Sequence, residues 1–329
     1  MKPQIFNRRH ALLGVLLSTL CGWTLTAQAQ STWPSKPLRM IVAFPPGGPT
    51  DLVSRVIAQR LSEQLGQPVV IDNKPGAGGN IAAEMAANAP ADGYTLFYNT
   101  SAIVIGPALY SKVNYDPVKD FAPVTLTAAV PMVLVTHPGL PVRSAKDFID
   151  YARSRPGQLN YGSSGTGTIT HLASAMMSAQ LGLQTQHVPY KGSAPALVDV
   201  ATGQTQFMID TMNTVLPYVR DGRLRALAVS SLKRSSVLPD LPTLHESGMT
   251  GFDAAAWQGV VVPAATPAEI VQRLNAELNK ALAHPEVRTK LALQGADPIG
   301  GSAADYAAYI RSELPRWSKA VKDSGARAD

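Results

Sequence analysis

The segment Leu38–Arg60 constrains the fold more than any other part of the sequence. It reads LRMIVAFPPGGPTDLVSRVIAQR, with an apolar run up to Phe44, a loop rich in proline and glycine, and an amphipathic pattern that begins at Thr50. A buried strand that turns through such a loop into a helix is typical of α/β folds with parallel strands. The loop could hold a phosphate, a catalytic group or a carboxylate, and other residues have to separate these possibilities.

The same strand, loop and helix unit recurs along the chain. After the strand Leu38–Phe44, apolar runs predict strands at Val69–Asp72 and Tyr94–Tyr98, with helices over Asp51–Leu65 and Ile81–Asn88. A second series has predicted strands at Leu159–Gly162, His187–Tyr190 and Phe207–Asp210, and a helix over Ala194–Ala201. Repeated units of this kind predict mainly parallel sheets flanked by helices.

The helix over Asp51–Leu65 has recognisable start and stop signals. Thr50 or Asp51 is expected to cap its first turn, and Gly66 is expected to end it. Its apolar residues, Leu52 among them, recur at the spacing of one helical face. We therefore expect that face, including Leu52, to be buried against the sheet.

Two apolar segments predict passages between two domains. The first, Val124–Thr136, is interrupted by Pro131, and a proline within a strand marks an edge or a crossing. The second is Leu224–Ser230, beyond which helices are predicted to the end, the clearest over Pro267–Leu282. The expected division is a discontinuous domain of residues 30–127 and 231–329 and an inserted domain of residues 128–230. A binding cleft is expected between them.

Residues 1–29 are typical of a secretory signal peptide. Lys2, Arg8 and Arg9 precede a short apolar stretch, and Ala27-Gln28-Ala29 is a small-residue cleavage pattern. We expect export to the periplasm and cleavage after Ala29, and the paired arginines also fit twin-arginine export. The only cysteine, Cys21, lies inside this segment, so the mature chain has no thiol for catalysis, metal binding or a disulfide.

Charge points to a small anion as the ligand. The whole chain carries 29 basic and 23 acidic residues, but three of the basic residues leave with the signal peptide, so the mature balance is 26 to 23, or +3. A mild positive field suits an anionic small molecule. Basic residues are not clustered with aromatic ones, so no nucleic-acid partner is expected.

Motifs for nucleotides and metals are missing from the sequence. Gly76-Ala77-Gly78 lacks the third glycine of a dinucleotide fingerprint, because Ile81 stands at that position. The six histidines are scattered and do not form a zinc motif such as H-E-x-x-H. We therefore expect no metal and no cofactor.

A serine hydrolase is the alternative that the residues leave open. Gly162-Ser163-Ser164-Gly165 resembles a nucleophile elbow, although Thr166 stands where that motif needs glycine. Ser164, His171 and Asp210 could then form a catalytic triad. The competing interpretation, which we favour, is that His171 packs or caps within its own domain and that the protein is not an enzyme.

Three loops favour a carboxylate ligand. Pro45–Asp51, Asn99–Ala102 and Ser163–Thr168 each follow a predicted strand, contain glycine or hydroxyl residues, and open a helix. A helix N-terminus offers unpaired N–H groups and a partial positive charge, so it can hold an anion without arginine.

Several longer segments resemble a known family. FPPGGPTDLVSR, DNKPGAGGNIAAE, YGSSGTGTITHLA, VPYKGSAPAL, GRLRALAVSS, LPDLPTLHESG and WQGVVVPAATPAEIVQRLN are similar, in order and spacing, to the periplasmic receptors of tripartite tricarboxylate transporters, the TctC-like or Bug receptors. The resemblance covers Ser31–Asp329. It implies a two-domain periplasmic binding protein, type II-like, that closes over a small carboxylate such as a di- or tricarboxylate, an acidic amino acid or an aromatic acid. It also implies a monomer that delivers the ligand to integral membrane permease subunits, or signals to a sensor instead.

The resemblance also implies the residues of the binding site. A carboxylate would be held mainly by backbone amides, and only Pro49 departs from the commonest family form of the first loop, where it removes a donor. The implied ligand-binding residues are Phe44, Pro45, Gly47, Gly48, Asp51, Asn99, Thr100, Ser101, Ser163, Ser164, Thr166, Thr168, Tyr190, Lys191, Gly192 and Asp210.

Overall fold

The computed structural model describes residues 33–328. The predicted signal peptide, with Cys21 and the cleavage position after Ala29, lies outside the described residues. Within the described part, none of the helices combines the length and the apolar character that crossing a bilayer requires. From Lys36 onward the chain forms one compact unit that contains two sheets.

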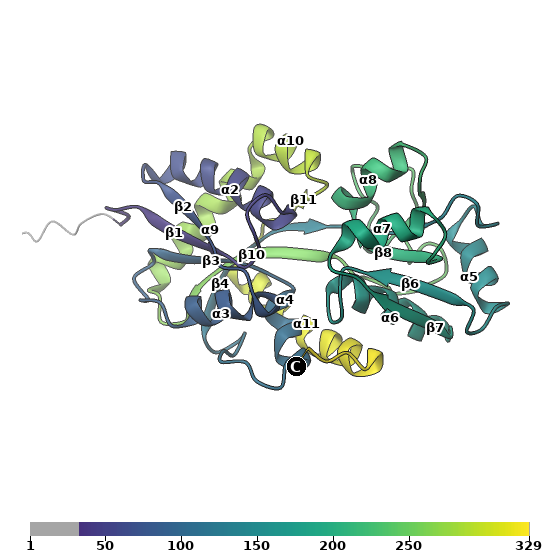
Figure 1. The fold of residues 1–329 in the computed structure, drawn as a ribbon. Helices are drawn as coiled ribbons and strands as arrows, with labels where there is room; N and C mark the ends of the chain where they lie inside the picture. The colour runs from purple at the N-terminus through teal and green to yellow at the C-terminus, as the bar shows by residue number, and fades with distance from the viewer. Residues whose placement is uncertain (1–32, 329) are drawn as a thin grey trace, which may run out of the picture. The chain divides into compact units, whose positions relative to one another are not determined.

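The first sheet has six strands in the order β11-β4-β10-β3-β1-β2 (Figure 1). The strands are β1 (Leu38–Val42), β2 (Val69–Asn73), β3 (Thr95–Thr100), β4 (Phe121–Val130), β10 (Ala256–Pro263) and β11 (Asp297–Pro298). β1 is parallel to β2 and β3, whereas β10 is antiparallel to β3 and β4, and β11 is antiparallel to β4. We call this sheet with its helices the first lobe.

The second sheet has five strands in the order β7-β6-β8-β5-β9. The strands are β5 (Met132–Thr136), β6 (Leu159–Ser163), β7 (Thr185–Pro189), β8 (Phe207–Thr211) and β9 (Arg225–Val229). β6 is parallel to β7 and β8, and β5 is antiparallel to β8 and β9. This sheet with its helices is the second lobe. The prediction of two α/β lobes is confirmed, but both sheets are mixed, so their parallel part is smaller than expected.

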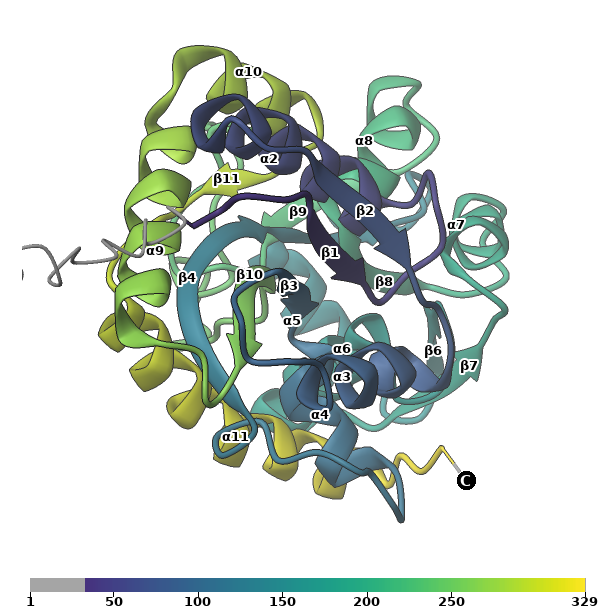
Figure 2. The same cartoon turned by 90° about the vertical axis from the view of Figure 1, so that its left-hand side faces the viewer.

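Helices pack on both sheets (Figures 1 and 2). The first lobe has α2 (Pro49–Leu65), α3 (Asn80–Ala87), α4 (Ala102–Leu109), α9 (Ala268–Ala283), α10 (Pro285–Leu293) and α11 (Ala303–Ser324), with a 3₁₀ turn η1 (Ala77–Gly79) before α3. The second lobe has α5 (Ala145–Arg153), α6 (Ile169–Leu181), α7 (Ser193–Ala201) and α8 (Met212–Arg220). α2 contacts both α9 and β2, and α11 contacts β4, α4 and α6.

Burial in the second lobe follows the pleat of its inner strand β5, which lies between β8 and β9. Met132 and Leu134 belong to the buried cluster on one face of the sheet, whereas Val133 and Val135 belong to the cluster on the other. Successive side chains of a strand point to opposite faces, so a strand covered by helices on both sides is apolar at every position. The continuous apolar run in the sequence therefore reflects burial on both faces.

Two segments connect the sheets. Pro131 separates β4 from β5, which lie in different sheets, and residues 230–255 lead from β9 back to β10. At the start of this return segment, the Ser230 N–H donates to Met132 O at 2.8 Å, and the Ser230 hydroxyl donates to Ala254 O at 2.7 Å. The start of the return segment is thus hydrogen-bonded to β5, just after the first crossing.

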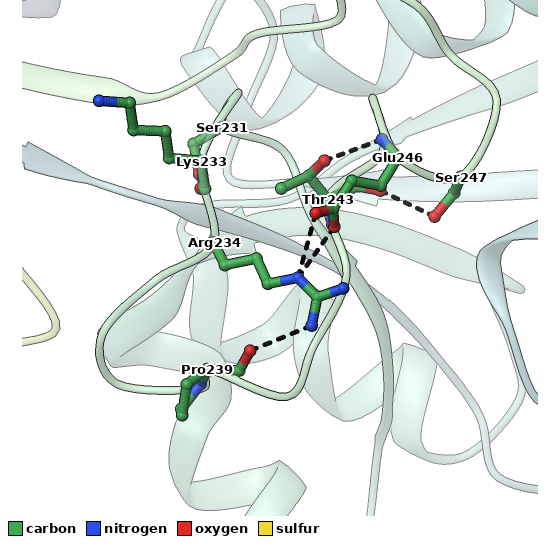
Figure 3. A network of polar contacts seen from close by, with 7 residues as sticks. All are labelled: Ser231, Lys233, Arg234, Pro239, Thr243, Glu246 and Ser247. Atoms are coloured by element: carbon green, nitrogen blue, oxygen red, sulfur yellow. Dashed lines mark hydrogen bonds and ion pairs between the residues drawn. The ribbon is translucent and has the colours of Figure 1, made fainter.

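A polar network braces the middle of the return segment (Figure 3). Arg234 Nε contacts both carboxylate oxygens of Glu246, at 3.0 and 3.2 Å. Glu246 in turn accepts the Thr243 N–H at 2.8 Å, and the Glu246 N–H donates to the Thr243 hydroxyl at 2.9 Å. This reciprocal pair satisfies the backbone donors of Thr243 and Glu246 at the start of the turn.

A buried carboxylate joins α11 to β10. Glu313 Oε2 accepts hydrogen bonds from the indole nitrogens of Trp257 and Trp317, both at 2.8 Å, and from Arg316 Nη2 at 2.7 Å. Arg316 Nη1 also donates to the backbone oxygen of Asp253, just before β10, at 2.6 Å. α11 is therefore tied to the end of the return segment.

Three local predictions are wrong. Helix α2 begins after Gly48, with Pro49 in its first turn, and neither Thr50 nor Asp51 is its N-cap residue. Leu52 is 38% exposed, because α2 buries a face centred on Val53 and Ile57 instead. The largest miss is β10: only helices were predicted after Ser230, yet Ala256–Pro263 is a central strand of the first sheet.

Candidate functional site

Three loops of the first lobe converge at one edge of its sheet. β1, β2 and β3 are parallel, so their carboxyl ends lie at the same edge. Gly79, in the loop after β2, lies between Ala43 after β1 and Ala102 after β3, and a Cβ there would be 3.3 and 3.6 Å from their methyl groups. Gly79 also has a φ of +103°, a left-handed conformation that favours glycine.

Asp51 organises the loop after β1. The Gly47 N–H and Arg55 Nε donate to Asp51 Oδ2, each at 2.8 Å, and Asn73 Nδ2 donates to Oδ1 at 2.9 Å. Asn73 Nδ2 also donates to Phe44 O at 2.9 Å. Asp51 is 1% exposed, so its carboxylate serves the loop backbone rather than the solvent.

The protonation of Asp51 follows from this environment. Burial raises the pKa of the carboxyl, but hydrogen bonds from Arg55, Gly47 and Asn73 outweigh burial and hold the pKa below its usual range. Asp51 is therefore ionised at neutral pH. Pro45 and Gly47 are exposed and Gly48 is half-buried, so the loop presents glycine backbone to the solvent beside proline rings.

Four helices that follow strands of the two sheets begin without a side-chain cap, whereas α6 is capped by the Thr168 hydroxyl. The N-cap residues of α2, α4, α7 and α8 make no capping hydrogen bond through a side chain, and they are Gly48, Ser101, Gly192 and Thr211. α9 and α10 also lack one, so the missing cap alone does not mark a site. What distinguishes α2, α4, α7 and α8 is their position after strands that end at one edge of a sheet.

The residues predicted at the end of β3 are mostly engaged. Asn99 and Thr100 lie in the strand rather than in a loop, and the helix N-cap is Ser101. Both amide atoms of buried Asn99 bond the hydroxyl of Tyr306, at 2.8 and 3.0 Å. The Thr100 hydroxyl accepts the Ala102 N–H at 3.2 Å. Asn99 therefore supports the end of the strand from inside.

Hydroxyl groups hold the loop after β6 in the second lobe. Thr170 Oγ1 accepts the Ser164 N–H at 2.8 Å and lies 2.9 Å from the hydroxyls of both Ser164 and Thr168. The Thr168 hydroxyl donates to Gly165 O at 2.7 Å. Thr166 is exposed at the tip of this loop.

The loop after β7 lies directly beside the loop after β6. The N–H groups of Tyr190 and Gly192 donate to the oxygens of Ser163 and Ser164, both at 3.1 Å. The Tyr190 hydroxyl donates to Asp199 Oδ2 at 2.6 Å, and burial, together with this carboxylate, raises the pKa of Tyr190 to about 12. The neighbouring Lys191 is exposed.

Two histidines pack behind the loop after β6. The rings of His171 and His187 are stacked, with centroids 3.7 Å apart and an interplanar angle of 9°. The Gly167 N–H donates to His171 Nδ1 at 3.1 Å, and His187 Nε2 lies 2.6 Å from the Ser163 hydroxyl. The sequence analysis favoured packing or capping of His171 within its own domain over a catalytic role, but it did not connect His171 with His187.

Asp210 is buried near the end of β8 in the second lobe. Its Oδ1 accepts the Thr211 N–H at 2.7 Å, while Oδ2 is buried without a hydrogen-bond partner among the described residues. Burial raises the pKa of Asp210 to about 6, against the opposing effect of the hydroxyls of Ser193, Thr211 and Thr214 and of the Thr211 N–H. This carboxyl therefore titrates close to neutral pH.

The loop after β6 contacts the first lobe. Gly167, with a φ of +75°, packs against the side chain of Leu109 at the end of α4, where a Cβ would overlap the leucine methyl groups. Leu172 of α6 is buried in the same cluster as Ile103 and Trp257 of the first lobe. The second-lobe loop is thus positioned partly by the helix that opens at Ser101.

The geometry does not assemble the alternative hydrolase triad. The Ser164 hydroxyl bonds Thr170, and His171 Nδ1 accepts a backbone N–H, so these two side chains are engaged elsewhere.

Residues 33–328 also contain no group of three or more His, Cys, Asp or Glu side chains that could hold a metal ion.

The contacts that hold these loops include residues that the sequence analysis did not single out. They are Asn73, Arg55, Thr170, His187 and Ser193. Each of them contacts a residue that lies at least one helical turn away in the sequence or on another strand, so no local sequence motif predicts the contact.

Two surface cavities lie outside the loops, one of about 540 Å³ beside the start of α5 and one of about 320 Å³ between α2 and α10.

Residues 53–326 match the family described as "Tripartite tricarboxylate transporter family receptor". Among curated proteins, the chain is 40% identical over 322 residues to "UPF0065 protein in tcbD-tcbE intergenic region" of Pseudomonas sp. (strain P51), covering 97% of this chain and 96% of that protein. It is 37% identical over 323 residues to "Protein BugT" of Bordetella pertussis, covering 98% of each.

Solved structures match over the same range. "R. palustris Rpa4515 with adipate" is 42% identical with a TM-score of 0.78, covering 90% of this chain and 100% of that one. "Structure of periplasmic binding protein BugD" is 33% identical with a TM-score of 0.75, over 90% and 100% of the two chains. "MatC (Rpa3494) from Rhodopseudomonas palustris with bound malate" is 34% identical with a TM-score of 0.73, over 88% and 100%.

Proposed function

Because this chain belongs to the tripartite tricarboxylate transporter receptor family, we propose that it captures a small carboxylate between its two lobes and delivers it to membrane permease subunits. The family is one of periplasmic solute-binding receptors, not enzymes. Relatives with 42% and 34% identity were solved with adipate and malate, which supports a dicarboxylate among the proposed ligands, namely di- or tricarboxylates, acidic amino acids and aromatic acids.

One observation carries the proposal of a carboxylate. The loop after β1 exposes backbone at Gly47 and Gly48, and the buried Asp51 carboxylate holds that backbone from behind. The N-cap Gly48 has no side chain to satisfy the first N–H groups of α2. A helix N-terminus of this kind binds an anion through backbone donors.

The site that we propose keeps the predicted residues and assigns them two kinds of role. Pro45, Gly47, Gly48, Thr166 and Lys191 are partly or fully exposed, and they are the candidates for direct contact. Buried or engaged groups, namely Asp51, Asn99, Ser163, Tyr190 and Asp210, are proposed to hold the loops in shape. Phe44, Thr100, Ser101, Ser164, Thr168 and Gly192 complete the set.

We retain the division of the mature chain into residues 30–127 with 231–329, and residues 128–230, as a proposal. It is supported by the strands at both crossings, because β4 and β5 lie in different sheets, as do β9 and β10. Export by a signal peptide cleaved after Ala29, and action as a monomer, are parts of the same proposal.

Thermal unfolding of the mature protein against a panel of acids tests the function. The panel holds citrate, adipate, malate, acidic amino acids, nicotinate and phthalate, with adipamide as a neutral match for adipate. A ligand at about 100 times its dissociation constant adds roughly 2.7 kcal/mol. For a chain of this size that is a rise of roughly 5–10 °C in Tm.

A saturable rise with one acid and none with adipamide is the expected result. Protein that was denatured, stripped and refolded is scanned beside the native preparation, because a copurified ligand would mask the shift. If the stripped protein ignores every acid on the panel, the carboxylate proposal is contradicted.

A further inference from the structure

The stacked pair of His171 and His187 lies against a loop of the proposed site without being part of its surface. His171 is the third residue of α6 and is 3% exposed, and His187 lies in the middle of β7, in register with Tyr161 of β6. Tyr161 stacks on His187 with ring centroids 5.1 Å apart. The three rings form one layer beneath Ser163 and Gly167.

Hydrogen bonding fixes the state of His171 in this layer. A backbone N–H is always a donor, so the Gly167 N–H requires His171 Nδ1 to be an unprotonated acceptor at 3.1 Å. Protonation of Nδ1 would remove that bond and leave the Gly167 N–H facing another donor. His187 Nε2 meets the Ser163 hydroxyl at 2.6 Å, and Ser163 in turn bonds both the N–H and the oxygen of Gly165 at 3.1 Å.

No opposite charge faces the two rings. Tyr161 is the other titratable side chain in ring contact with them, and burial raises its pKa to about 12, so it stays neutral. Phe207 of β8 packs on Tyr161, and Leu109 of α4 packs on Gly167. Among residues 33–328 no carboxylate forms an ion pair with either histidine, so a proton on one ring would meet the other ring at 3.7 Å uncompensated.

From this geometry we propose that the neutral His171–His187 pair positions the loop Ser163–Thr168, and that acidification weakens ligand binding by protonating the pair. The inference rests on the proposed function for its binding readout, but its structural part does not. His171 and His187 are positioning residues, because His171 is buried and the contacts of both rings are to the loop itself, at Gly167 and Ser163.

The direction of the pH effect follows from linkage. Burial first, and His187 second, lower the pKa of His171 from 6.5 to about 4, and burial also lowers the pKa of His187. A loosened loop that exposes His171 would restore the pKa of 6.5, so the loosened form binds more protons between pH 6.5 and 4. The loop is therefore fully supported above pH 6.5 and loses support as pH falls towards 4. At pH 5 the protonation of His171 can shift the equilibrium between the ordered and the loosened loop by at most about 30-fold.

The first experiment needs no ligand. In ¹⁵N-labelled mature protein, the amide signals of Gly165 and Gly167 are followed from pH 8 to pH 3.5 beside the ring signals of both histidines. We expect the Gly167 amide to move with the His171 titration and its protection from hydrogen exchange, relative to the intrinsic rate at each pH, to fall as the ring charges. An amide that stays unchanged while His171 becomes protonated overturns the positioning role.

The second experiment measures binding of adipate and malate by calorimetry at pH 7.5 and pH 5. His171→Asn keeps an acceptor near the position of Nδ1 and cannot titrate, and His187→Gln keeps an amide that can bond the Ser163 hydroxyl as donor or acceptor and cannot titrate. His245→Asn is the matched control, because His245 Nδ1 accepts the Gly251 N–H at 2.9 Å on an exposed turn. The acids themselves and Asp210 titrate in the same way with every variant, so they do not contribute to a difference between variants.

Between pH 7.5 and pH 5 we expect the dissociation constant to rise in the wild type and in His245→Asn. The factor of this rise should be at least three times the factor found for His171→Asn. Equal pH dependence in all the variants overturns the proposal and leaves the receptor function intact. If neither acid binds any protein at pH 7.5, the proposed ligand class fails, and the amide titration alone decides the role of the histidines. A histidine variant that does not fold leaves the wild-type amide titration as the deciding test.

Discussion

Asp51 Oδ2 accepts the Gly47 N–H at 2.8 Å, so a side chain in the first turn of α2 holds the backbone of the loop that precedes its own helix. Asp51→Asn places an amide donor either at the position of Oδ2, opposite both Gly47 and Arg55, or at that of Oδ1, opposite Asn73. We expect the free energy of unfolding to fall by about 1–3 kcal/mol and the affinity for the carboxylate to fall at least about tenfold. Urea unfolding and calorimetry measure the two effects.

Asp72→Asn is the matched control for Asp51. Asp72 lies on β2, where its carboxylate accepts a hydrogen bond from Arg39 Nε of β1 at 2.7 Å. Asp72 is partly exposed, so the substitution should lower the free energy of unfolding by roughly 1 kcal/mol or less. Its effect on affinity should be small. Equal losses of affinity in the two variants would contradict a specific role for Asp51.

Substitutions at Gly48 test direct contact with the ligand. Gly48 has extended backbone angles, φ −76° and ψ 166°, and a Cβ would lie 3.4 Å from Pro45 O, which is an ordinary contact. Side chains therefore fit the backbone but occupy the space in front of the helix N-terminus. We expect Gly48→Ala to bind nearly normally and Gly48→Leu to lose binding about tenfold or more, with a Tm within roughly 4 °C of the wild type.

Calorimetry on the Gly48 series separates contact from folding. If Gly48→Leu binds with unchanged affinity, the loop after β1 does not face the ligand.

The Ser164→Ala variant separates a receptor from a hydrolase. Its loop keeps the Ser164 N–H bond to Thr170 and loses only the hydroxyl contact of 2.9 Å. Because Ser164 belongs to the proposed ligand-binding set, loss of one hydrogen bond from its hydroxyl to the ligand, about 1 kcal/mol, predicts roughly fivefold weaker binding. An activated ester such as p-nitrophenyl acetate should be turned over by neither protein. Turnover by the wild type that disappears in Ser164→Ala, but not in Thr166→Ala, would revive the hydrolase.

Asp210 should make stability depend on pH. Its folded pKa of about 6 lies above the unfolded value of 3.8, so the folded state binds more protons between these values, and ionisation costs stability as pH rises through this window. The cost is complete above about pH 6 and is on the order of 3 kcal/mol at most. We expect Asp210→Asn to be more stable than the wild type at pH 7.5 and similar to it near pH 4.

Urea unfolding at pH 4, 5, 6 and 7.5 provides the Asp210 curve. A difference between variant and wild type that does not change with pH would show that burial of the charge is not the cause. Glu269→Gln, an exposed carboxylate on α9, controls for general charge effects.

Glu313 should matter for stability and not for binding. Its Oε2 accepts three donors in the interior, so Glu313→Gln removes the charge partner of Arg316 and replaces three hydrogen bonds to a carboxylate by weaker ones to a neutral amide oxygen. We expect the free energy of unfolding to fall by about 2–4 kcal/mol, with affinity within about twofold of the wild type. A tenfold loss of affinity at unchanged stability would contradict this division of roles.

Much of the fold was predictable because local patterns carry it. The run Leu38–Phe44 and the spacing of Val53, Ile57 and Leu61 predict β1 and α2, and Gly66 ends the helix with a φ of +66° as a glycine C-cap should. The start of α2 was misplaced because Asp51 has two possible uses. Its side chain bonds the N–H of the preceding Gly47 instead of an N–H in the helix.

β10 shows the limit of local reasoning. Ala256–Pro263 is apolar enough for a strand, but its partners are β3 and β4, far away in the sequence, and it runs antiparallel to both. An apolar run of this length among helices does not reveal its pairing. The same limit hid the histidine pair, because His171 is on a helix and His187 on a strand, and only the packing of α6 on the sheet stacks their rings.

The contact between Gly167 and Leu109 sets a rule for anyone who redesigns this receptor. The space that a side chain would need at position 167 is filled by the leucine at the end of α4. A library that varies only the loop after β6 will therefore lose its members with larger residues at position 167 to steric overlap, whatever acid it is selected to bind. Shortening Leu109 relieves the overlap, while the φ of +75° still disfavours any residue except glycine. Redesign should hold Gly167 fixed and reshape the pocket from the Leu109 side.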